Sequence, residues 1–273
     1  MPVSTGAAGR PVGWQPVTST DRILRWLGWL ALVALTVFCW RVMTANTIWS
    51  FVSDAPRQAA DIFGRMIPPR WDYADQLWLP LWDTINIATL GTLIAIAIAT
   101  PLAFLAARNT TPSVLLVRPV ALFIIVASRS INALIWGLLM VAVFGPGVFA
   151  GIVAIALRSI GFIGKLLYEA IEEIDETQVE AVRASGASPA QVMSYGIIPQ
   201  ILPAFATISV FRWDINIRES TVLGLVGAGG LGLALEASLN ILAWPQVSVI
   251  LLMILGTVVI SEWITACVRR AII

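Results

Sequence analysis

The sequence predicts an all-α, polytopic bundle of about six membrane-spanning helices, and three observations support this fold class. Hydrophobic residues make up 58% of the 273 residues, only 12% are charged, and the mean hydropathy is +0.86. A soluble domain carries about a quarter charged residues. The apolar residues also gather into long runs, as the hydrocarbon core of a bilayer requires. A soluble helical core is the alternative that this composition disfavours.

The chain begins with a predicted tail and a first span. Residues 1–20 are rich in Pro, Gly, Ser and Thr and lack an apolar period, which predicts a disordered cytoplasmic tail. The apolar run 26–40 is short, so Arg25 and Arg41 are expected to extend toward the membrane surfaces. A signal peptide begins in a similar way, but no clear small-residue cleavage site follows. We therefore predict an uncleaved span.

An amphipathic segment follows from residue 46 to residue 80. Its apolar residues recur at helical spacing with charged residues between them, and Pro68 and Pro69 are expected to end the helix. Three tryptophans suit a membrane surface, namely Trp71, Trp78 and Trp82. The segment 21–83 therefore predicts the first span and an external interfacial helix.

Residues 84–273 are predicted to form the core membrane domain. Its five apolar runs cover residues 85–107, 119–144, 148–167, 199–224 and 244–268. Each is long enough to span a bilayer, which takes about 20 residues. The run 119–144 is interrupted by Arg129, and Gly145-Pro146-Gly147 predicts a tight turn after it.

The distribution of Arg and Lys predicts the orientation. Basic residues recur in the segments that a cytoplasmic N-terminus would place inside the cell, whereas the turn at 145–147 and the stretch 227–240 carry none. This pattern places both termini and the polar segment 169–195 in the cytoplasm. We expect a multi-pass protein of the bacterial inner membrane.

The composition also excludes several function classes. Histidine is absent, which removes His-based triads and His-ligated zinc or haem. No catalytic residue, metal site or cofactor is predicted in this chain, which is not expected to be an enzyme. The 17 basic and 16 acidic residues give no charge excess that would attract nucleic acid. Cys39 and Cys267 lie in apolar runs and are interpreted as small helix-packing residues.

The cytoplasmic segment contains a helix–glycine–helix pattern. Residues 180–183 predict part of a short amphipathic helix, which Gly186 breaks. After Ala187, Ser188 is predicted to cap a new helix whose first residue is Pro189. A hairpin of this kind, protruding from a membrane domain, has a shape that a partner protein can bind and move.

This pattern resembles the EAA loop of ABC importer permeases, in which Glu-Ala-Ala is followed after three residues by Gly and after nine more by Ile-x-Leu-Pro. The positions that match in register are Glu180, Ala181, Gly186 and Pro199. The positions that depart from it conservatively in size are Val182, Gly196 and Ile198. The sequences 212–218 and 223–232 resemble the phosphonate-type permeases of this family.

The resemblance implies the architecture of a type I ABC importer permease, similar to the methionine permeases. It implies that a coupling loop, residues 169–198, docks on a cytoplasmic ATPase through Glu180, Ala181, Gly186, Ala187 and Ser188. Two ATPase subunits would bind ATP and Mg²⁺ and drive alternating access. The other implied partners are a second copy of the chain, an external substrate-binding protein and membrane lipid. The implied substrate is phosphonate or a related phosphorus oxyanion such as phosphate or phosphite.

Ionisable side chains inside the predicted spans call for a reason, because each costs about 2.5–3.5 kcal/mol to insert. They are Arg129, Arg158, Arg212, Asp214, Arg218 and Glu219. Four arginines against two carboxylates leave a charge of +2 per subunit and +4 in a homodimer. A positive lining suits an anion, because guanidinium groups bind oxyanions bidentately.

Two interpretations of these charges stay open. In the first, Arg212, Asn216 and Arg218 face a substrate path, with Arg129 and Arg158 behind or beside them. In the second, the arginines pair with helix C-terminal carbonyls or the two acids and only hold the spans together. The spacing predicts that Asp214 pairs with Arg218, and that Arg212, Asn216 and Glu219 share another face.

A glycine-rich stretch satisfies the pattern G-x-G-x-x-G through Gly227, Gly229, Gly230 and Gly232. Its neighbours are an apolar span and an apolar segment rather than a strand and a soluble helix, so nucleotide binding is not predicted. We predict that these glycines let the chain turn and pack at the external end of the path, as a gate or stop.

Three rival functions differ in what they require. An importer for methionine or another small solute would share the coupling loop. An ion-coupled secondary transporter would work without an ATPase and leaves the loop unexplained. A membrane enzyme acting on lipid phosphates needs a nucleophile or metal cluster that the sequence does not offer.

Overall fold

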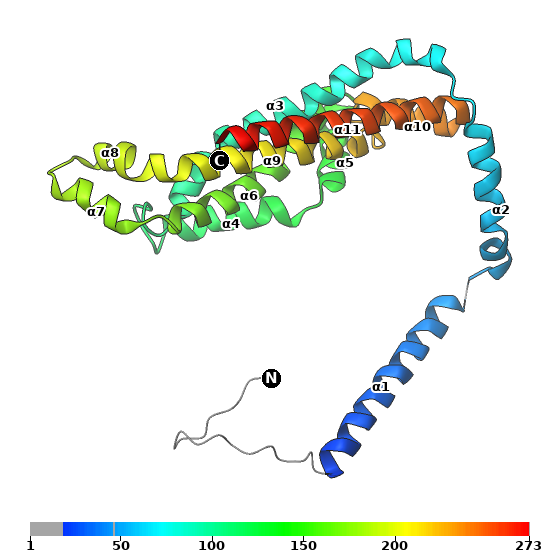
Figure 1. The fold of residues 1–273 in the computed structure, drawn as a ribbon, viewed down its shortest axis with the longest axis horizontal. Coiled ribbons are helices and arrows are strands. Elements are labelled where there is room, and N and C mark those ends of the chain that lie inside the picture. Colours follow the sequence, from blue (N-terminus) through cyan, green and yellow to red (C-terminus); the bar gives the residue numbers. More distant parts are fainter. Residues whose placement is uncertain (1–18, 46, 273) are drawn as a thin grey trace. The chain divides into compact units, whose positions relative to one another are not determined.

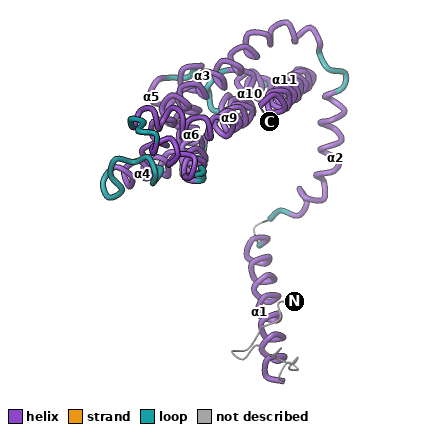
Figure 2. The backbone as a smooth tube through the Cα atoms, turned by 60° about the vertical axis from the view of Figure 1, so that its left-hand side comes forward, coloured by secondary structure: helices purple, strands orange, loops and turns teal. Residues whose placement is uncertain are grey.

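The structure is a computed structural model that describes residues 19–45 and 47–272 (Figure 1). The regular elements among these residues are all helices, drawn purple in Figure 2, which confirms the all-α prediction. The chain divides into two units, Met1–Ala60 and Asp61–Ile273, and each is described by itself. Within the described residues, five helices are long and apolar enough to cross a membrane, and one bent pair brings the total to as many as six.

Helix α1 (Ser19–Thr44) is the first candidate span. It begins inside the predicted tail and extends beyond both ends of the predicted run 26–40. Asp21 in its first turn and Arg41 in its last turn complement the helix dipole, which favours helix at these polar ends. Residues 1–18, the rest of the predicted tail, lie outside the described residues.

Helix α2 (Trp49–Met66) is the amphipathic segment, and it ends just before Pro68 and Pro69 as predicted. None of its side chains is buried, and Asp61 pairs with Arg65 one turn later at 2.9 Å. The location of α2 on the membrane surface stays a prediction.

Helix α3 (Ala74–Ala106) corrects the predicted start of the second span near residue 85. It follows a short 3-10 turn, Trp71–Tyr73, and includes Trp78, Pro80 and Trp82, which were expected in the external interfacial segment before the span. Leu77 is fully buried against a cluster of residues from α10 and α11. This packing stabilises helix on both sides of Pro80, where the sequence alone favours a break.

The predicted span 119–144 is two helices, α4 (Val117–Ser130) and α5 (Ala133–Phe144), bent by 91°. Asn132 caps α5 by accepting a hydrogen bond from the Leu134 N–H at 3.1 Å. The carbonyls freed at the bend find donors, because Trp136 Nε1 binds Ser128 O at 3.3 Å and Arg158 Nη1 binds Ile131 O at 3.0 Å. These caps explain why a continuous apolar run is broken here.

Helix α6 (Val148–Glu172) lies between the α4–α5 pair and α9 in Figure 2 and is the most enclosed of the candidate spans. It ends five residues after the predicted limit at residue 167. The turn before it was predicted, and both of its glycines have positive φ, 85° at Gly145 and 149° at Gly147. The Gly147 N–H donates to Gly227 O at 2.9 Å, which ties this turn to the glycine-rich turn.

The coupling loop is a helical hairpin, as predicted. Helix α7 (Glu176–Ala184) leads through Gly186 into α8 (Pro189–Gln191), a π-helical segment (Val192–Ile197) and α9 (Ile198–Gly224). The last three form one helix, Pro189–Gly224, of 36 residues. Figure 1 shows α7 and α8 protruding together from one end of the helices α3 to α11.

The chain ends with α10 (Gly230–Asn240) and α11 (Trp244–Ile272), which pack on α9 and α3. The predicted glycine-rich stretch thus contains a short helix, and the last span begins where predicted. Cys39 and Cys267 are free and exposed in the chain, rather than packed as predicted.

Candidate functional site

Glu219 on α9 joins two arginines inside the membrane domain. Its Oε2 accepts a hydrogen bond from Arg212 Nη2 at 3.0 Å, and its Oε1 accepts one from Arg158 Nε at 3.3 Å. Arg212 is only 2% exposed and also donates to Ser159 Oγ at 2.9 Å. Its guanidinium carbon lies 5.0 Å from the centre of the Phe162 ring, a cation–π distance. The predicted common face of Arg212 and Glu219 is therefore confirmed.

Asn216 is fully buried beside this group. Its amide nitrogen donates to Thr92 Oγ1 at 2.7 Å and to Ser159 Oγ at 3.0 Å. Sequence reasoning missed Ser159 and Thr92, because hydroxyl residues are common in spans and their partners are distant in the chain. Arg212 and Asn216 thus lie within the subunit in this structure, and their exposure to a path stays a prediction.

Arg218 leads a second charged group on α9. Its Nη2 donates to Asp214 Oδ2 at 2.6 Å, as the spacing predicts, and its Nη1 donates to Glu262 Oε1 at 3.0 Å. Asp214 also accepts a hydrogen bond from Ser261 Oγ at 2.7 Å. Glu262, on α11, was left out of the predicted charge count. Four arginines against three carboxylates give 4 − 3 = +1 per subunit, rather than +2.

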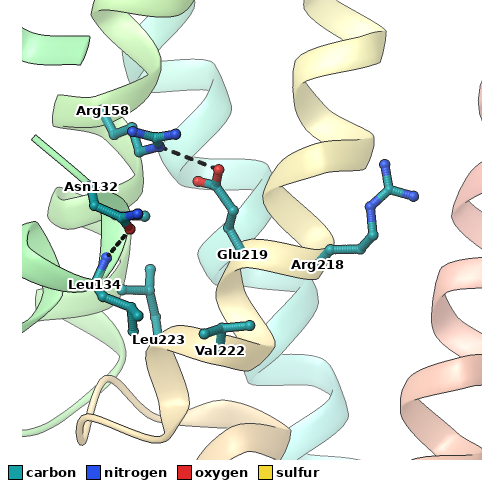
Figure 3. Close-up of a pocket in the computed structure, with 8 residues that line it drawn as sticks. Asn132, Leu134, Arg158, Arg218, Glu219, Val222 and Leu223 are labelled. Carbon is teal, nitrogen blue, oxygen red and sulfur yellow. Dashed lines mark hydrogen bonds and ion pairs between the residues drawn. The ribbon is translucent and has the colours of Figure 1, made fainter. Parts of the chain in front are cut away.

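A pocket of about 330 Å³ lies between α9 and the bend that joins α4 to α5. Its polar lining residues are Asn132, Arg158, Arg218 and Glu219, and its apolar ones are Ala133, Leu134, Val222 and Leu223. Figure 3 shows the Arg158 and Glu219 side chains pointing toward each other, while Arg218 leaves α9 in another direction. Sequence reasoning missed Asn132, although Asn before an apolar run is a helix-start signal.

Arg129 is not part of this group. It lies exposed in the last turn of α4, where its charge complements the helix dipole. Within the described residues its side chain makes no hydrogen bond or ion pair. Its predicted role behind the path therefore has no supporting contact here.

The coupling loop is held by local caps. Ser188 Oγ accepts a hydrogen bond from the Gln191 N–H, and Gln191 Oε1 accepts one from the Ser188 N–H, which is the predicted N-cap completed as a capping box. Gly186 has a φ of 81°, and a Cβ placed on it would have nothing within 4 Å. The glycine is therefore required here by its backbone conformation, and not by packing within the chain.

The outer face of the coupling loop is open. Glu180 and Ala181 are exposed, and Glu180 makes no ion pair with the described part of the chain, so its predicted partner would have to lie elsewhere. The inner face is packed, because Val179 is buried against Val192 and Ile197 of the π-helical segment.

The start of α7 is fixed by Asp175. Its carboxylate accepts a hydrogen bond from the Thr177 N–H at 2.9 Å, and hydrogen bonds to Thr177 hold the pKa of Asp175 below its ordinary value. Its backbone N–H donates to Gln200 Oε1 at 2.9 Å, which ties this cap to the first turn of α9.

The glycine-rich turn needs glycine for two reasons. Gly227, Gly229 and Gly230 have φ between 72° and 90°, a range that other residues rarely adopt. A Cβ on Gly232 would overlap the Thr221 carbonyl oxygen, because α9 and α10 pack in direct contact. The predicted turn and close packing are confirmed, and the gating role stays a prediction.

These features define a class of protein: a helical membrane protein with a protruding helical hairpin and a charged pocket among its candidate spans. The chain belongs to the family described as the inner membrane component of binding-protein-dependent transport systems, which its residues 99–273 match. The resemblance to ABC importer permeases of the phosphonate type is thereby confirmed.

Individual relatives agree with this assignment. The chain is 39% identical over 267 residues to a phosphite transport system permease protein of Stutzerimonas stutzeri, covering 93% of this chain and 95% of that one. It is 40% identical over 209 residues to a phosphate-import permease protein of Mycolicibacterium smegmatis, covering 77% of this chain and 39% of that one. A solved methionine ABC transporter, in inward-facing conformations, has a similar fold, with a TM-score of 0.63 and 22% identity over 72% of this chain and 96% of its own.

Proposed function

We propose that this permease carries a phosphorus oxyanion, of the phosphite, phosphonate or phosphate class, into the bacterial cell. The observation that carries the proposal is the 39% identity to a phosphite permease over nearly the whole of both chains. The charged pocket supports it, because a guanidinium group is suited to the oxygens of such an anion. A relative in Vibrio cholerae named as a probable D-methionine transport permease is 27% identical over 58% of the chain, which makes methionine the weaker candidate.

The complete importer would contain two copies of the chain, two cytoplasmic ATPase subunits and an external binding protein. The ATPases bind and hydrolyse Mg²⁺-ATP and grip the exposed face of the coupling loop, including Glu180, Ala181, Gly186 and Ser188. Both chain termini lie in the cytoplasm in this arrangement. Ala187 is half-buried and belongs to the hinge between the two helices.

The substrate path would pass the pocket. Arg158, Arg218 and Glu219 line it, while Arg212 and Asn216 hold Glu219 and the spans in place from behind. The glycine-rich turn at 227–232 closes the external end as a gate.

The test is uptake into liposomes that contain the permease, its ATPase and its binding protein. We expect ATP-dependent uptake of phosphite, methylphosphonate or phosphate, and none with an ATPase that binds ATP without hydrolysing it. Methionine uptake in place of these anions would contradict the substrate class. Transport by the permease alone, driven by an ion gradient, would contradict the importer mechanism.

A further inference from the structure

The carboxylate of Glu219 has two arginine partners of unequal character. Arg212 is 2% exposed and is also held by Ser159 and the Phe162 ring. The Arg158 side chain is 27% exposed and lines the pocket. Its bond to Glu219 is the longer of the two, 3.3 Å against 3.0 Å. Arg212 is therefore the fixed partner of Glu219, and Arg158 is the one that solvent reaches.

Arg158 uses only part of its hydrogen-bonding capacity. Nε binds Glu219 through a single bond, Nη1 binds Ile131 O at 3.0 Å, and Nη2 has no hydrogen bond within the described residues. Arginine binds an oxyanion best through two parallel bonds. A tetrahedral oxyanion can make such a paired contact with Nε and Nη2, provided that Glu219 gives up Nε.

A second donor lies on the same wall of the pocket. Asn132 uses its side-chain oxygen to cap α5, and its amide nitrogen makes no hydrogen bond within the described part of the chain. Figure 3 shows Asn132 and Arg158 beside each other, with Glu219 reaching toward Arg158 from α9. One anion at this position can therefore be held by Arg158 and Asn132 together.

The charges favour an exchange of anions. Two guanidinium groups and one carboxylate leave this group with a net charge of 2 − 1 = +1. This surplus positive charge attracts an anion at short range, whereas the two carboxylates of the second group, Asp214 and Glu262, are paired with Arg218. When Glu219 releases Arg158, it keeps its bond to Arg212, so no buried carboxylate is left without a partner.

We propose that Glu219 is a resident counter-ion that the transported oxyanion displaces from Arg158, with Asn132 as the second ligand of that oxyanion. This inference rests on the proposed function. The competition between Glu219 and the oxyanion keeps the affinity of the pocket for the oxyanion low, so that the bound anion dissociates again. The high-affinity site remains on the binding protein.

Anion binding to the purified full-length permease tests the exchange. Phosphite and phosphate are titrated by calorimetry in detergent, in a buffer whose other anion is large and weakly binding. Glu219→Gln removes the competing charge, and we expect phosphite binding about tenfold tighter than in the wild type. Affinity unchanged or weaker in a folded Glu219→Gln permease would overturn the proposal.

Two further variants carry the test if Glu219→Gln does not fold. Arg158→Gln leaves the Arg212–Glu219 pair intact and should abolish binding. Asn132→Ser keeps a helix-capping residue but removes the amide donor, and should weaken phosphite binding about threefold. Arg65→Gln breaks an exposed arginine–carboxylate pair outside the pocket and is the matched control, with no change expected. Binding retained in Arg158→Gln within twofold of the wild type would overturn the proposal.

Uptake by the complete importer separates this inference from the proposed function. If the wild type imports phosphite and Arg158→Gln imports it at the same rate, the exchange is wrong and the function stands. If the wild-type importer carries none of the phosphorus oxyanions, the proposed function fails first.

Discussion

At the scale of single residues, the structure shows how the membrane domain accommodates its charges. Each arginine of α9 meets a carboxylate: Arg212 meets Glu219, and Arg218 meets Asp214 and Glu262. The desolvation cost of such charges is offset when each has a partner and further hydrogen bonds. Outside the spans, a single residue can decide the conformation of the backbone. Gly186 in the coupling loop is the clearest case, because it adopts a positive φ of 81°.

Replacing Gly186 tests whether its backbone conformation or its lack of a side chain matters. Gly186→Ala forces a φ of 81° on a residue with a Cβ, at a cost of about 1–2 kcal/mol. We expect the amount of ATPase subunit that co-purifies with the permease to fall about fivefold or more. Gly186→Asn should be tolerated better, because Asn adopts positive φ more readily. Equal loss in both variants would show that the partner's close approach is what excludes a side chain. Gly64→Ala, at an open helical position, is the control.

The cap at Asp175 makes α7 sensitive to acid. The pKa of the folded-state carboxyl is lowered by its bonds to Thr177, so the cap stabilises α7 above the ordinary pKa of about 3.9 and loses this effect as the pH falls through the lowered value. Hydrogen exchange of the α7 amides, corrected for intrinsic rates, should show protection falling below about pH 4. In Asp175→Asn this pH dependence should vanish. An unchanged profile in that variant would assign the acid sensitivity to another group.

At the scale of elements, the sequence predicted what depends on neighbours in the chain and missed what depends on distant ones. The hairpin of α7 and α8 was predicted because Gly186, Ser188 and Pro189 act locally. The start of α3 was missed because buried Leu77, rather than local propensity, keeps those turns helical. The bend between α4 and α5 was missed because its freed carbonyls are bound by side chains, Trp136 on α5 and the distant Arg158 on α6, that the apolar pattern does not single out.

Direct contact between α9 and α10 makes Gly232 a sensitive position. Gly232→Ala places a methyl group against the Thr221 carbonyl, and overpacking of this kind costs about 1–3 kcal/mol. We expect the thermal unfolding midpoint in detergent to fall by at least about 3 °C. Gly256→Ala on α11, where a Cβ meets nothing within 4 Å, should leave the midpoint unchanged or slightly higher. Equal midpoints for the two variants would contradict the close helix contact.

At the scale of the whole molecule, the charged pocket could be predicted only in part. The pair Asp214–Arg218 followed from its spacing of four residues. The bond between Arg158 and Glu219 joins residues 61 positions apart, so no local pattern contains it. Glu262 is a single acid in a long apolar run, and only the fold brings it to Arg218.

The orientation of the chain can be measured with single cysteines. Cys39 and Cys267 are replaced by alanine, and a cysteine is placed at Ser188 or at Pro146, which are both exposed. A maleimide that does not cross membranes should label Pro146→Cys in intact spheroplasts and Ser188→Cys only after the membrane is opened. Labelling of Ser188→Cys from outside would remove the basis for ATPase coupling.

The continuous helix Pro189–Gly224, made of α8, the π-helical segment and α9, has a mechanical consequence. Its hairpin end at Pro189 and Glu219 belong to the same helix and are separated by roughly 45 Å at 1.5 Å per residue. A tilt of about 5° pivoting at the tip would shift Glu219 by roughly 4 Å over that length, more than the 3.3 Å that joins it to Arg158. A small rotation of this helix about its hairpin end is thus sufficient to break or form the bond between Glu219 and Arg158.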